Sequence, residues 1–305
     1  MIISGLHLLL TYQCTFECDH CFVWSSPSQP GVMNLVQVHE IMRQARELEG
    51  LEWIYFEGGE PFLYFPILLR GVQLATAMGF QAGVVTNAYW ATTPEDALAW
   101  LKPLSGLIAD LSISGDRYHD PGGKSLRAEN ALAAAKTLGI PVDLISVAQP
   151  ASEGLDPLRG QIPPGESAVM FRGRAAELLA PRVRGVPWDQ LDSCPHEDLV
   201  DPGRVHLDPF GNIQICQGIT LGNIFERPLK QIFGDYHAAD HPICGPLLRR
   251  GPRGLVEDYH LLHEETYADA CHLCYASRLQ LRDHFPSILT PAQVYGLEEP
   301  QESVP

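Results

Sequence analysis

The chain has 305 residues, of which 45% are hydrophobic and 19% charged, a composition that excludes a wholly disordered or fibrous protein. Lys and Arg number 21 against 37 Asp and Glu, and the resulting net charge of −16 disfavours binding to the phosphates of nucleic acids. No run of about 18 apolar residues is present and the first basic residue is Arg43, so we expect neither a membrane span nor a signal peptide. We therefore expect a cytoplasmic protein that binds neither nucleic acid nor membrane.

Strand and helix patterns alternate over the first 175 residues or so. Short apolar runs predict six strands, at residues 6–12, 52–57, 82–86, 107–114, 142–147 and 167–171. Helical periodicity lies between them, at residues 34–49, 64–78, 94–101 and 125–138. Short links between strands and helices favour a parallel sheet with right-handed crossovers. The pattern predicts an α/β fold with an open or partial barrel.

The pattern changes near residue 185. Two short strands at 204–207 and 213–216 flank the sequence from Asp208 to Asn212, which contains Pro and Gly and predicts a hairpin. Helices are expected at 228–233, 256–265 and 270–284, a loop at 149–165, and a frayed end at 296–305. We therefore assign residues 1–185 to the barrel and residues 186–305 to a small α+β domain.

The eight cysteines are unevenly spread along the chain. Disulfide frameworks belong to small secreted proteins, so metal or redox chemistry is the better expectation here. Cys14, Cys18 and Cys21 directly follow the first predicted strand. Iron–sulfur clusters normally have four thiolate ligands, and three thiolates leave one iron of a four-iron cluster open to a reactant. A zinc knuckle is the alternative, although zinc sites favour paired Cys-x2-Cys units.

These residues carry a family resemblance. The pattern Cys14-x3-Cys18-x2-Cys21, followed by the aromatic Phe22, resembles the signature of the radical S-adenosylmethionine (radical SAM) enzymes. Further elements at the ends of the second and third predicted strands resemble the family's GGEP and TN motifs, namely Gly58, Gly59, Glu60, Pro61, Thr86 and Asn87. Other candidates for binding SAM lie at or after the fourth strand: Ser112, Ser114, Asp116, Lys124 and Arg127. Parallel sheets place ligands at this edge.

The resemblance implies a partial (β/α)6 TIM-like barrel and a [4Fe–4S] cluster whose open iron binds SAM. It further implies reductive cleavage of SAM to a 5′-deoxyadenosyl radical, which removes a hydrogen atom from a substrate. The electron would come from a reducing flavodoxin- or ferredoxin-type donor. Family members often bind the SAM carboxylate through a basic residue on a later strand. The strand at 142–147 has none, so Lys124 or Arg127 is expected in that role.

A second cysteine set lies in the C-terminal part. Cys194, the pattern Gly211-x4-Cys216, the pair Cys271-x2-Cys274 and the sequence Gly222-Asn-Ile resemble the twitch form of the SPASM extension. That extension binds an auxiliary [4Fe–4S] cluster, which the resemblance implies would take an electron from an oxidised substrate radical. The alternative is a structural zinc site with four cysteine ligands.

Three residues are candidates for catalysis. Asp116 and His119 follow the fourth strand and could accept a proton from the substrate. Cys244 could be a buried thiol, an alternative cluster ligand or a hydrogen donor. Some radical SAM peptide epimerases use such a donor, but Gln217 stands where their cysteine can follow the auxiliary ligand. Two arginines after the sixth predicted strand, at 172 and 174, could contact adenosine or an anionic substrate, or offset nearby acids.

The leading hypothesis is oxidation, or a related modification, of a peptide, a protein or a small sugar-like molecule. A redox-neutral peptide epimerase that uses Cys244 is the second hypothesis, and a non-catalytic zinc or ferredoxin-like module is the third. Because the first cysteine is Cys14, we expect no leader-peptide-binding domain before the barrel. This slightly disfavours a self-sufficient peptide-modifying enzyme, although a separate leader-peptide-binding protein could replace such a domain.

Overall fold

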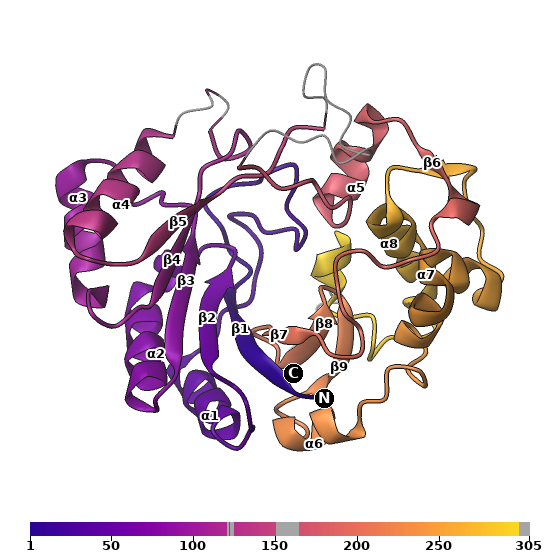
Figure 1. The fold of residues 1–305 in the computed structure, drawn as a ribbon, viewed down its shortest axis with the longest axis horizontal. Helices are drawn as coiled ribbons and strands as arrows, with labels where there is room; N and C mark the ends of the chain where they lie inside the picture. Colours follow the sequence, from indigo (N-terminus) through magenta and orange to yellow (C-terminus); the bar gives the residue numbers. More distant parts are fainter. Residues whose placement is uncertain (121, 123–124, 151–164, 299–305) are drawn as a thin grey trace, which may run out of the picture.

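One eight-stranded sheet runs through the molecule in the order β5-β4-β3-β2-β1-β7-β8-β9 (Figure 1). The computed structural model describes residues 1–120, 122, 125–150 and 165–298. The parallel half comprises β1 (Ile3–Thr11), β2 (Trp53–Gly58), β3 (Gln81–Thr86), β4 (Asp110–Ser114) and β5 (Val142–Ile145). The first five predicted strands are thus confirmed, because each is an apolar run that ends in a turn.

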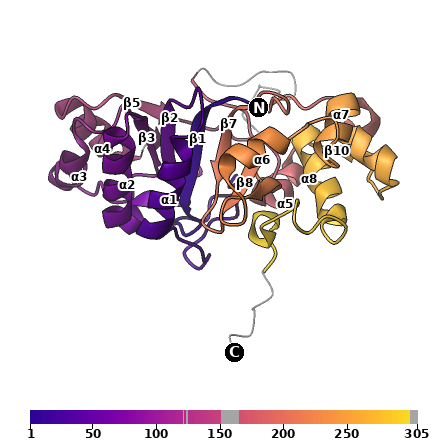
Figure 2. The same ribbon diagram turned by 90° about the horizontal axis from the view of Figure 1, so that it is seen from below.

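Four helices cover the outer face of these strands, α1 (Leu35–Ala45), α2 (Phe65–Ala77), α3 (Pro94–Leu101) and α4 (Leu126–Thr137). Three of them begin at a residue whose side chain accepts a backbone hydrogen bond: Asn34, Thr93 and Ser125. Their apolar faces share one core with the strands. Seen from below (Figure 2), these helices fill one half of the molecule and the C-terminal helices fill the other.

The sixth predicted strand, at residues 167–171, does not form. Ser167 makes a single parallel bridge to Val147 beyond β5. The next N–H groups do not continue this pairing, and the Phe171 N–H donates instead to Asp269 Oδ2 at 3.3 Å. The described part of the chain therefore has five parallel strands before this bridging segment, and the first four of them are each followed by a helix. Residues 151–164, most of the predicted loop, and residues 299–305, most of the predicted frayed end, lie outside the described residues.

The C-terminal part extends the same sheet. β7 (Gly203–Leu207) pairs in parallel with β1, from Ile3 beside Gly203 to Leu8 beside Leu207. β8 (Asn212–Cys216) follows antiparallel, which confirms the predicted hairpin. β9 (Ile219–Asn223) was not predicted and pairs antiparallel with β8. The hairpin that carries Cys216 is thereby joined to the barrel.

Helices lie beyond the hairpin. They are α6 (Leu229–Asp235), α7 (Cys244–Tyr259) and α8 (Ala270–Leu281), and a short α5 (Arg174–Leu178) precedes β6 (Val186–Pro187), which pairs with β10 (Thr266–Tyr267). The prediction of a helix at 256–265 is correct for residues 256–259 and wrong for residues 260–265. α7 begins at Cys244 and continues past a kink at Arg250 and Gly251, where a helix-breaking glycine and Pro252 hid it from sequence analysis. It ends before His260, which is left-handed.

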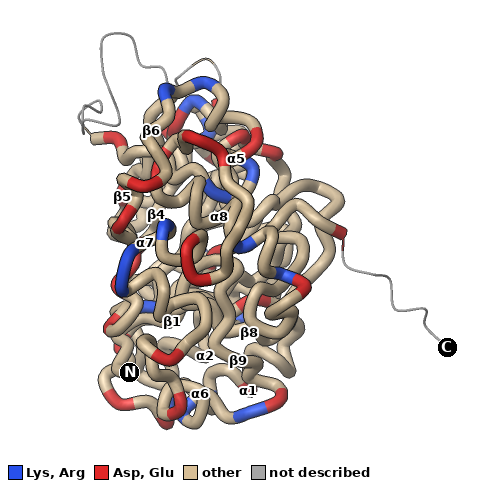
Figure 3. The backbone as a smooth tube through the Cα atoms, turned by 90° about the vertical axis from the view of Figure 1, so that its right-hand side faces the viewer, with Lys and Arg blue, Asp and Glu red and all other residues tan. Residues whose placement is uncertain are grey.

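Acidic and basic residues are intermixed on the side of α7 and α8 (Figure 3). On α7 itself, Arg249 and Arg250 pair with Asp258, and Arg253 pairs with Glu257. This charged face is therefore largely neutralised within one helix. In the described part of the chain, none of the helices has the length and apolar character needed to cross a membrane.

Asp208 fixes the turn between β7 and β8. Its fully buried carboxylate accepts hydrogen bonds from the N–H groups of Phe210 and Asn212, both at 2.9 Å. The side chains of Tyr12, Asn212 and Gln214 also donate to it, at 2.9–3.2 Å. Burial raises the pKa of Asp208 to about 6, even though these hydrogen bonds lower it.

We expect Asp208→Asn to remove the pH dependence that this carboxyl gives to stability. Its folded-state pKa lies above the ordinary value of 3.8, so its contribution is greatest at acid pH and declines as the pH rises towards 6. At about 1.36 kcal/mol per pKa unit, the wild type should lose about 2 kcal/mol relative to the variant between about pH 4.5 and 7. Urea unfolding of the iron-free proteins measures this change, and a difference that stays constant with pH would contradict it.

Candidate functional site

A cavity of about 490 Å³ opens at the carboxyl ends of the parallel strands. The predicted site residues that line it are Cys14, Cys18, Cys21, Gly58, Gly59, Thr86, Asn87, Ser112, Ser114, Asp116 and His119. This edge is where parallel sheets bind ligands, and small-molecule sites typically measure roughly 300–1,000 Å³. Segments far apart in the sequence therefore meet around one space large enough for a nucleotide.

The three N-terminal cysteines lie on the loop that follows β1. The N–H groups of Phe16 and Ser25 donate to the sulfurs of Cys14 and Cys21, at 3.4 and 3.3 Å. Burial raises the pKa of the Cys14 thiol to about 12 and that of Cys18 further still. The ionised thiols therefore need a cation beside them, and N–H groups that point at sulfur suit an iron–sulfur cluster.

Gly58 and Gly59 let the end of β2 approach this loop closely. The Gly59 N–H donates to the Thr11 carbonyl at 2.7 Å, and the next N–H donates to the Gln13 carbonyl at 2.9 Å. A Cβ on Gly59 would lie 2.1 Å from the Gln13 oxygen, and Gly58 has a φ of +132°. The contact between the two backbones therefore requires both glycines.

Glu60 lies behind the cavity wall and organises it. Its fully buried carboxylate accepts hydrogen bonds from the Phe62 N–H at 3.0 Å, the Thr86 hydroxyl at 2.8 Å and the Asn87 N–H at 2.7 Å. The Asn87 amide donates in turn to the Cys14 sulfur at 3.4 Å. Burial raises the pKa of Glu60 to about 7, although these hydrogen bonds lower it. Glu60 thus links the ends of β2 and β3 to the cysteine loop.

The other predicted SAM-binding residues differ in position. Pro61 is buried and does not line the cavity, whereas Ser112 lines it and donates to Asp110 Oδ2 at 3.0 Å. Arg127 is exposed on α4 and does not line the cavity, and Lys124 lies outside the described residues. Among the described lining residues there is no Lys or Arg. A basic partner for the SAM carboxylate therefore stays a prediction.

Asp116 and His119 form a polar pair just beyond β4. Asp116 Oδ1 lies 2.7 Å from His119 Nδ1, and its Oδ2 lies 3.9 Å from Nε2 of His20 in the cysteine loop. Burial raises the pKa of Asp116, but the two histidines lower it more, to a net value below the ordinary range. Burial lowers the pKa of His20 to about 4. A carboxylate and a neutral imidazole that could accept a proton therefore face the cavity.

A polar wall within strands β1, β2 and β7 was missed by sequence analysis. It comprises His7, Tyr55 and Glu57, which line the cavity, and the buried His206, which does not line it. Glu57 lies 3.0 Å from His7 Nδ1 and 3.3 Å from His206 Nε2, and Tyr55 stacks on His7 with ring centroids 4.7 Å apart. Burial raises the pKa of Glu57, but its histidine neighbours lower it to about 2. The sequence did contain a signal for this wall, namely polar residues at alternate positions of otherwise apolar strands. Residues at alternate positions lie on the same face of a sheet.

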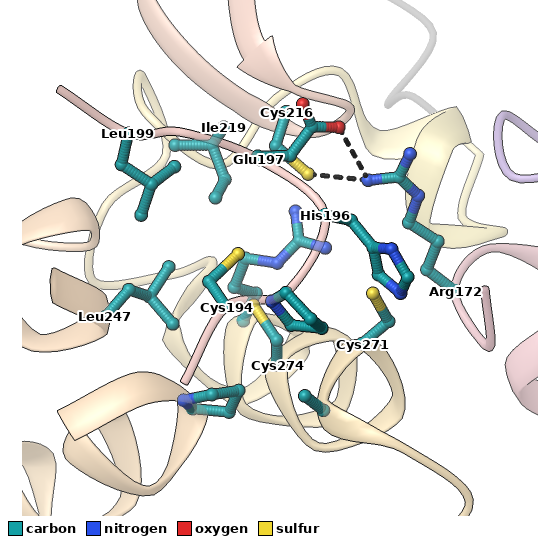
Figure 4. A pocket seen from close by; sticks show the side chains of 14 residues that line it. Arg172, Cys194, His196, Glu197, Leu199, Cys216, Ile219, Leu247, Cys271 and Cys274 are labelled. Atoms are coloured by element: carbon teal, nitrogen blue, oxygen red, sulfur yellow. Dashed lines mark hydrogen bonds and ion pairs between the residues drawn. The ribbon is translucent and has the colours of Figure 1, made fainter. Parts of the chain in front are cut away.

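The four C-terminal cysteines line a second pocket (Figure 4). Cys194 lies in the loop before β7 and Cys216 ends β8, while Cys271 and Cys274 lie in the first turns of α8. Their sulfurs point toward a common space. Burial raises the pKa of Cys194, Cys271 and Cys274, the last to about 12. These thiols, too, would ionise only beside a cation.

Two buried arginines enter this second pocket. Arg172 Nη1 donates to the Cys216 sulfur at 2.8 Å and lies 3.5 Å from Glu197 Oε1 (Figure 4). Arg278 Nη1 donates to the Gln217 carbonyl at 2.8 Å. The Nε atoms of both arginines are buried and have no partner among the described residues. Buried donors without acceptors are costly, so this donor set fits an electron-rich group held by the four cysteines.

Cys244 packs in the same buried cluster as Cys216 and Cys274 but lies outside both pockets. It is the first residue of α7, is 0% exposed and lines neither pocket. Burial raises the pKa of its thiol to about 12, and a hydrogen bond from Tyr236 lowers it. The structure thus brings Asp116 and His119 together at the first cavity but does not bring Cys244 to them.

Comparison with known proteins finds a family match for the part of the chain that forms most of the first cavity. A profile of the radical SAM superfamily matches residues 8–149. A protein of Bacillus subtilis (strain 168) described as "Putative peptide biosynthesis protein YydG" is 27% identical over 124 residues. That match covers 40% of this chain and only 39% of the relative's length.

Two solved structures share the fold at low identity. One is BtrN in complex with AdoMet and 2-DOIA, with a TM-score of 0.52 and 18% identity over 77% of this chain and 83% of that chain. The other is anSMEcpe with bound AdoMet and the Cp18Cys peptide, with a TM-score of 0.52 and 14% identity over 93% of this chain and 97% of that chain. The cysteine loop and the strand ends around it lie within residues 8–149, the part of this chain that matches the radical SAM superfamily.

Proposed function

We propose that this protein is an enzyme that reductively cleaves SAM and removes a hydrogen atom from a substrate. The match of residues 8–149 to the radical SAM superfamily supports a [4Fe–4S] cluster and SAM as the cofactors. Cys14, Cys18 and Cys21 would hold the cluster, and the glycines and polar side chains at the ends of β2, β3 and β4 would bind SAM. When bound, the cluster supplies the electron that splits SAM into methionine and a 5′-deoxyadenosyl radical. A flavodoxin- or ferredoxin-type protein is the proposed donor of that electron.

The observation that carries this proposal is the shared cavity. Three cysteines and the ends of three neighbouring strands line one space of about 490 Å³, within the residues that match the superfamily. Asp116 and His119 line the same space and are placed to take a proton from a substrate that loses a hydrogen atom there.

We further infer that Cys194, Cys216, Cys271 and Cys274 hold an auxiliary [4Fe–4S] cluster, in a twitch-like unit over residues 186–305. In a zinc site, sulfurs about 2.3 Å from the metal lie within about 4 Å of one another. Three groups of metal-ligating side chains in the described structure bring three ligand atoms within 4.8 Å, and none of these groups holds two cysteines. The wider spacing of the cysteines favours a larger cluster over a single zinc ion.

The proposed reaction is oxidation, or a related modification, of a peptide. The relative described as a peptide biosynthesis protein supports this class over a small sugar-like substrate. An auxiliary cluster would supply an acceptor for the second electron of an oxidation. The polar wall would then bind polar groups of the peptide. Epimerisation through Cys244 is less well supported, because that thiol is buried away from the cavity. A separate leader-peptide-binding protein would deliver such a peptide.

Iron content and SAM cleavage test the proposal together. After anaerobic reconstitution we expect about eight irons per chain, and about four when Cys14, Cys18 and Cys21 are replaced by alanine. Alanine at Cys194, Cys216, Cys271 and Cys274 should also leave about four, and only this second variant should still release 5′-deoxyadenosine with SAM and dithionite. Zinc in place of iron at either cysteine set would contradict the assignment for that set.

A further inference from the structure

The segment Phe171–Arg174 touches both cysteine sites. Arg172 and Arg174 are both buried, and neither lines the first cavity. One reaches the auxiliary set and the other reaches the loop of the N-terminal cysteines. In the structure these arginines therefore bind the two cysteine sites, whereas sequence analysis could only offer adenosine, an anionic substrate or nearby acids as their partners.

Arg174 anchors the segment to the N-terminal cysteine loop. Its N–H donates to the Cys21 carbonyl at 2.9 Å, and its guanidinium donates to the carbonyls of Cys18 and Ser25, both at 2.8 Å. Gly173, with a φ of +59°, packs so tightly that a Cβ would lie 2.6 Å from the Cys21 oxygen. Arg172 is thereby held in one place relative to the loop.

Arg172 faces the other way, into the auxiliary pocket. Its side chain is 4% exposed, and its 2.8 Å contact with the Cys216 sulfur is shorter than its 3.5 Å contact with Glu197. The guanidinium also lies 5.3 Å from the ring centroid of Phe22, which lines the first cavity. Glu197 has a second partner, Arg204, at 3.5 Å, so the carboxylate does not by itself account for Arg172.

We propose that Arg172 is a positioning residue that raises the reduction potential of the auxiliary cluster and so makes it an effective electron acceptor. Reduction adds negative charge, which a buried guanidinium stabilises strongly where the local dielectric constant is low. Hydrogen bonds to ligating sulfurs raise the potential in the same direction. The proposal rests on the proposed function, because it requires a cluster on Cys216.

The test is an EPR-monitored redox titration of the fully reconstituted protein and three variants. Arg172→Gln should make the auxiliary cluster at least tenfold harder to reduce, which is about 59 mV for one electron. Arg172→Lys keeps the charge but not the planar fork, and should give a smaller shift of the same sign. Arg204→Gln is the matched control, since it removes a charge beside the same Glu197 without touching a cysteine, and its potential should equal that of the wild type. The EPR signal that changes on adding SAM identifies the other cluster, and the reduction potential of that cluster should be the same in all variants.

The possible results distinguish a failure of the role proposed for Arg172 from a failure of the auxiliary cluster itself. A wild-type potential in either Arg172 variant that carries all eight expected irons overturns the role of Arg172. An equal shift in Arg204→Gln also overturns it, because the effect would then be one of general charge. If the wild type shows no auxiliary signal although its SAM-responsive signal is present, the auxiliary cluster of the proposed function fails, and the role of Arg172 fails with it.

Discussion

Replacing Cys18 with alanine is expected to abolish the reductive cleavage of SAM, with a loss greater than the ten- to hundredfold that removal of an outer partner of a metal site typically costs. In the proposed cluster site the Cys18 thiol is a ligand, whereas its backbone is held by other contacts. The Cys18 carbonyl accepts hydrogen bonds from the Cys21 N–H at 3.0 Å and from Arg174 at 2.8 Å. The loop should therefore keep its shape while it loses one of three ligands.

The measurement is 5′-deoxyadenosine released from SAM under dithionite, alongside iron content. The control is Ser28→Ala, since Ser28 is an exposed residue of the same loop whose hydroxyl lies 3.1 Å from the Ser26 hydroxyl, and whose N–H donates to that hydroxyl at 3.3 Å. We expect Ser28→Ala to bind iron and cleave SAM as the wild type does. Cleavage by Cys18→Ala within a fewfold of the wild-type rate would show that Cys18 is not a ligand.

Replacing Gly59 with alanine is expected to destabilise the fold and to empty the N-terminal cysteine site. The added Cβ would lie 2.1 Å from the Gln13 oxygen and 2.8 Å from the Tyr12 oxygen, and both of these belong to backbone that cannot swing aside. Overpacking of this kind costs about 3 kcal/mol. Any relief by separation would break the hydrogen bonds from Gly59 to Thr11 and from Glu60 to Gln13.

Denaturant unfolding of the iron-free protein measures the first effect, and iron content after reconstitution measures the second. Gly234→Ala is the matched control, because Gly234 lies inside α6 with nothing within 4 Å of its added Cβ. That control should be neutral or more stable by roughly 0.5–1 kcal/mol, as expected for alanine in a helix. If Gly59→Ala unfolds at the wild-type denaturant concentration, the close approach of β2 to the loop does not constrain the fold.

Local signals explain what the sequence could predict. Strands β1 to β5 are apolar runs with turns at their ends, and the spacing of Cys14, Cys18 and Cys21 lies within a single loop. Parallel pairing then places the ends of neighbouring strands at one edge. The match of residues 8–149 to the superfamily supports the family resemblance, and the parallel sheet confirms the fold class.

Contacts between segments far apart in the chain explain what the sequence could not predict. In the segment 167–171, where a strand was expected, the Phe171 N–H donates to Asp269, almost a hundred positions away in the sequence. Arg174 reaches Cys18 across 156 positions, so neither composition nor periodicity could reveal its partner. The polar wall joins strands β1, β2 and β7, and the position of β7 beside β1 depends on a pairing that no short window contains.

The pairing of β7 with β1 has a consequence for the folding of the whole chain. β1 is almost wholly buried and lies in the middle of the sheet only because β7 covers its second side. A chain that stopped after residue 185 would leave β1 as an edge strand with a row of unsatisfied amides and carbonyls. Such apolar edges template self-association between molecules. The C-terminal part therefore protects the parallel half from aggregation, and the parallel half should not be expected to fold as an independent unit.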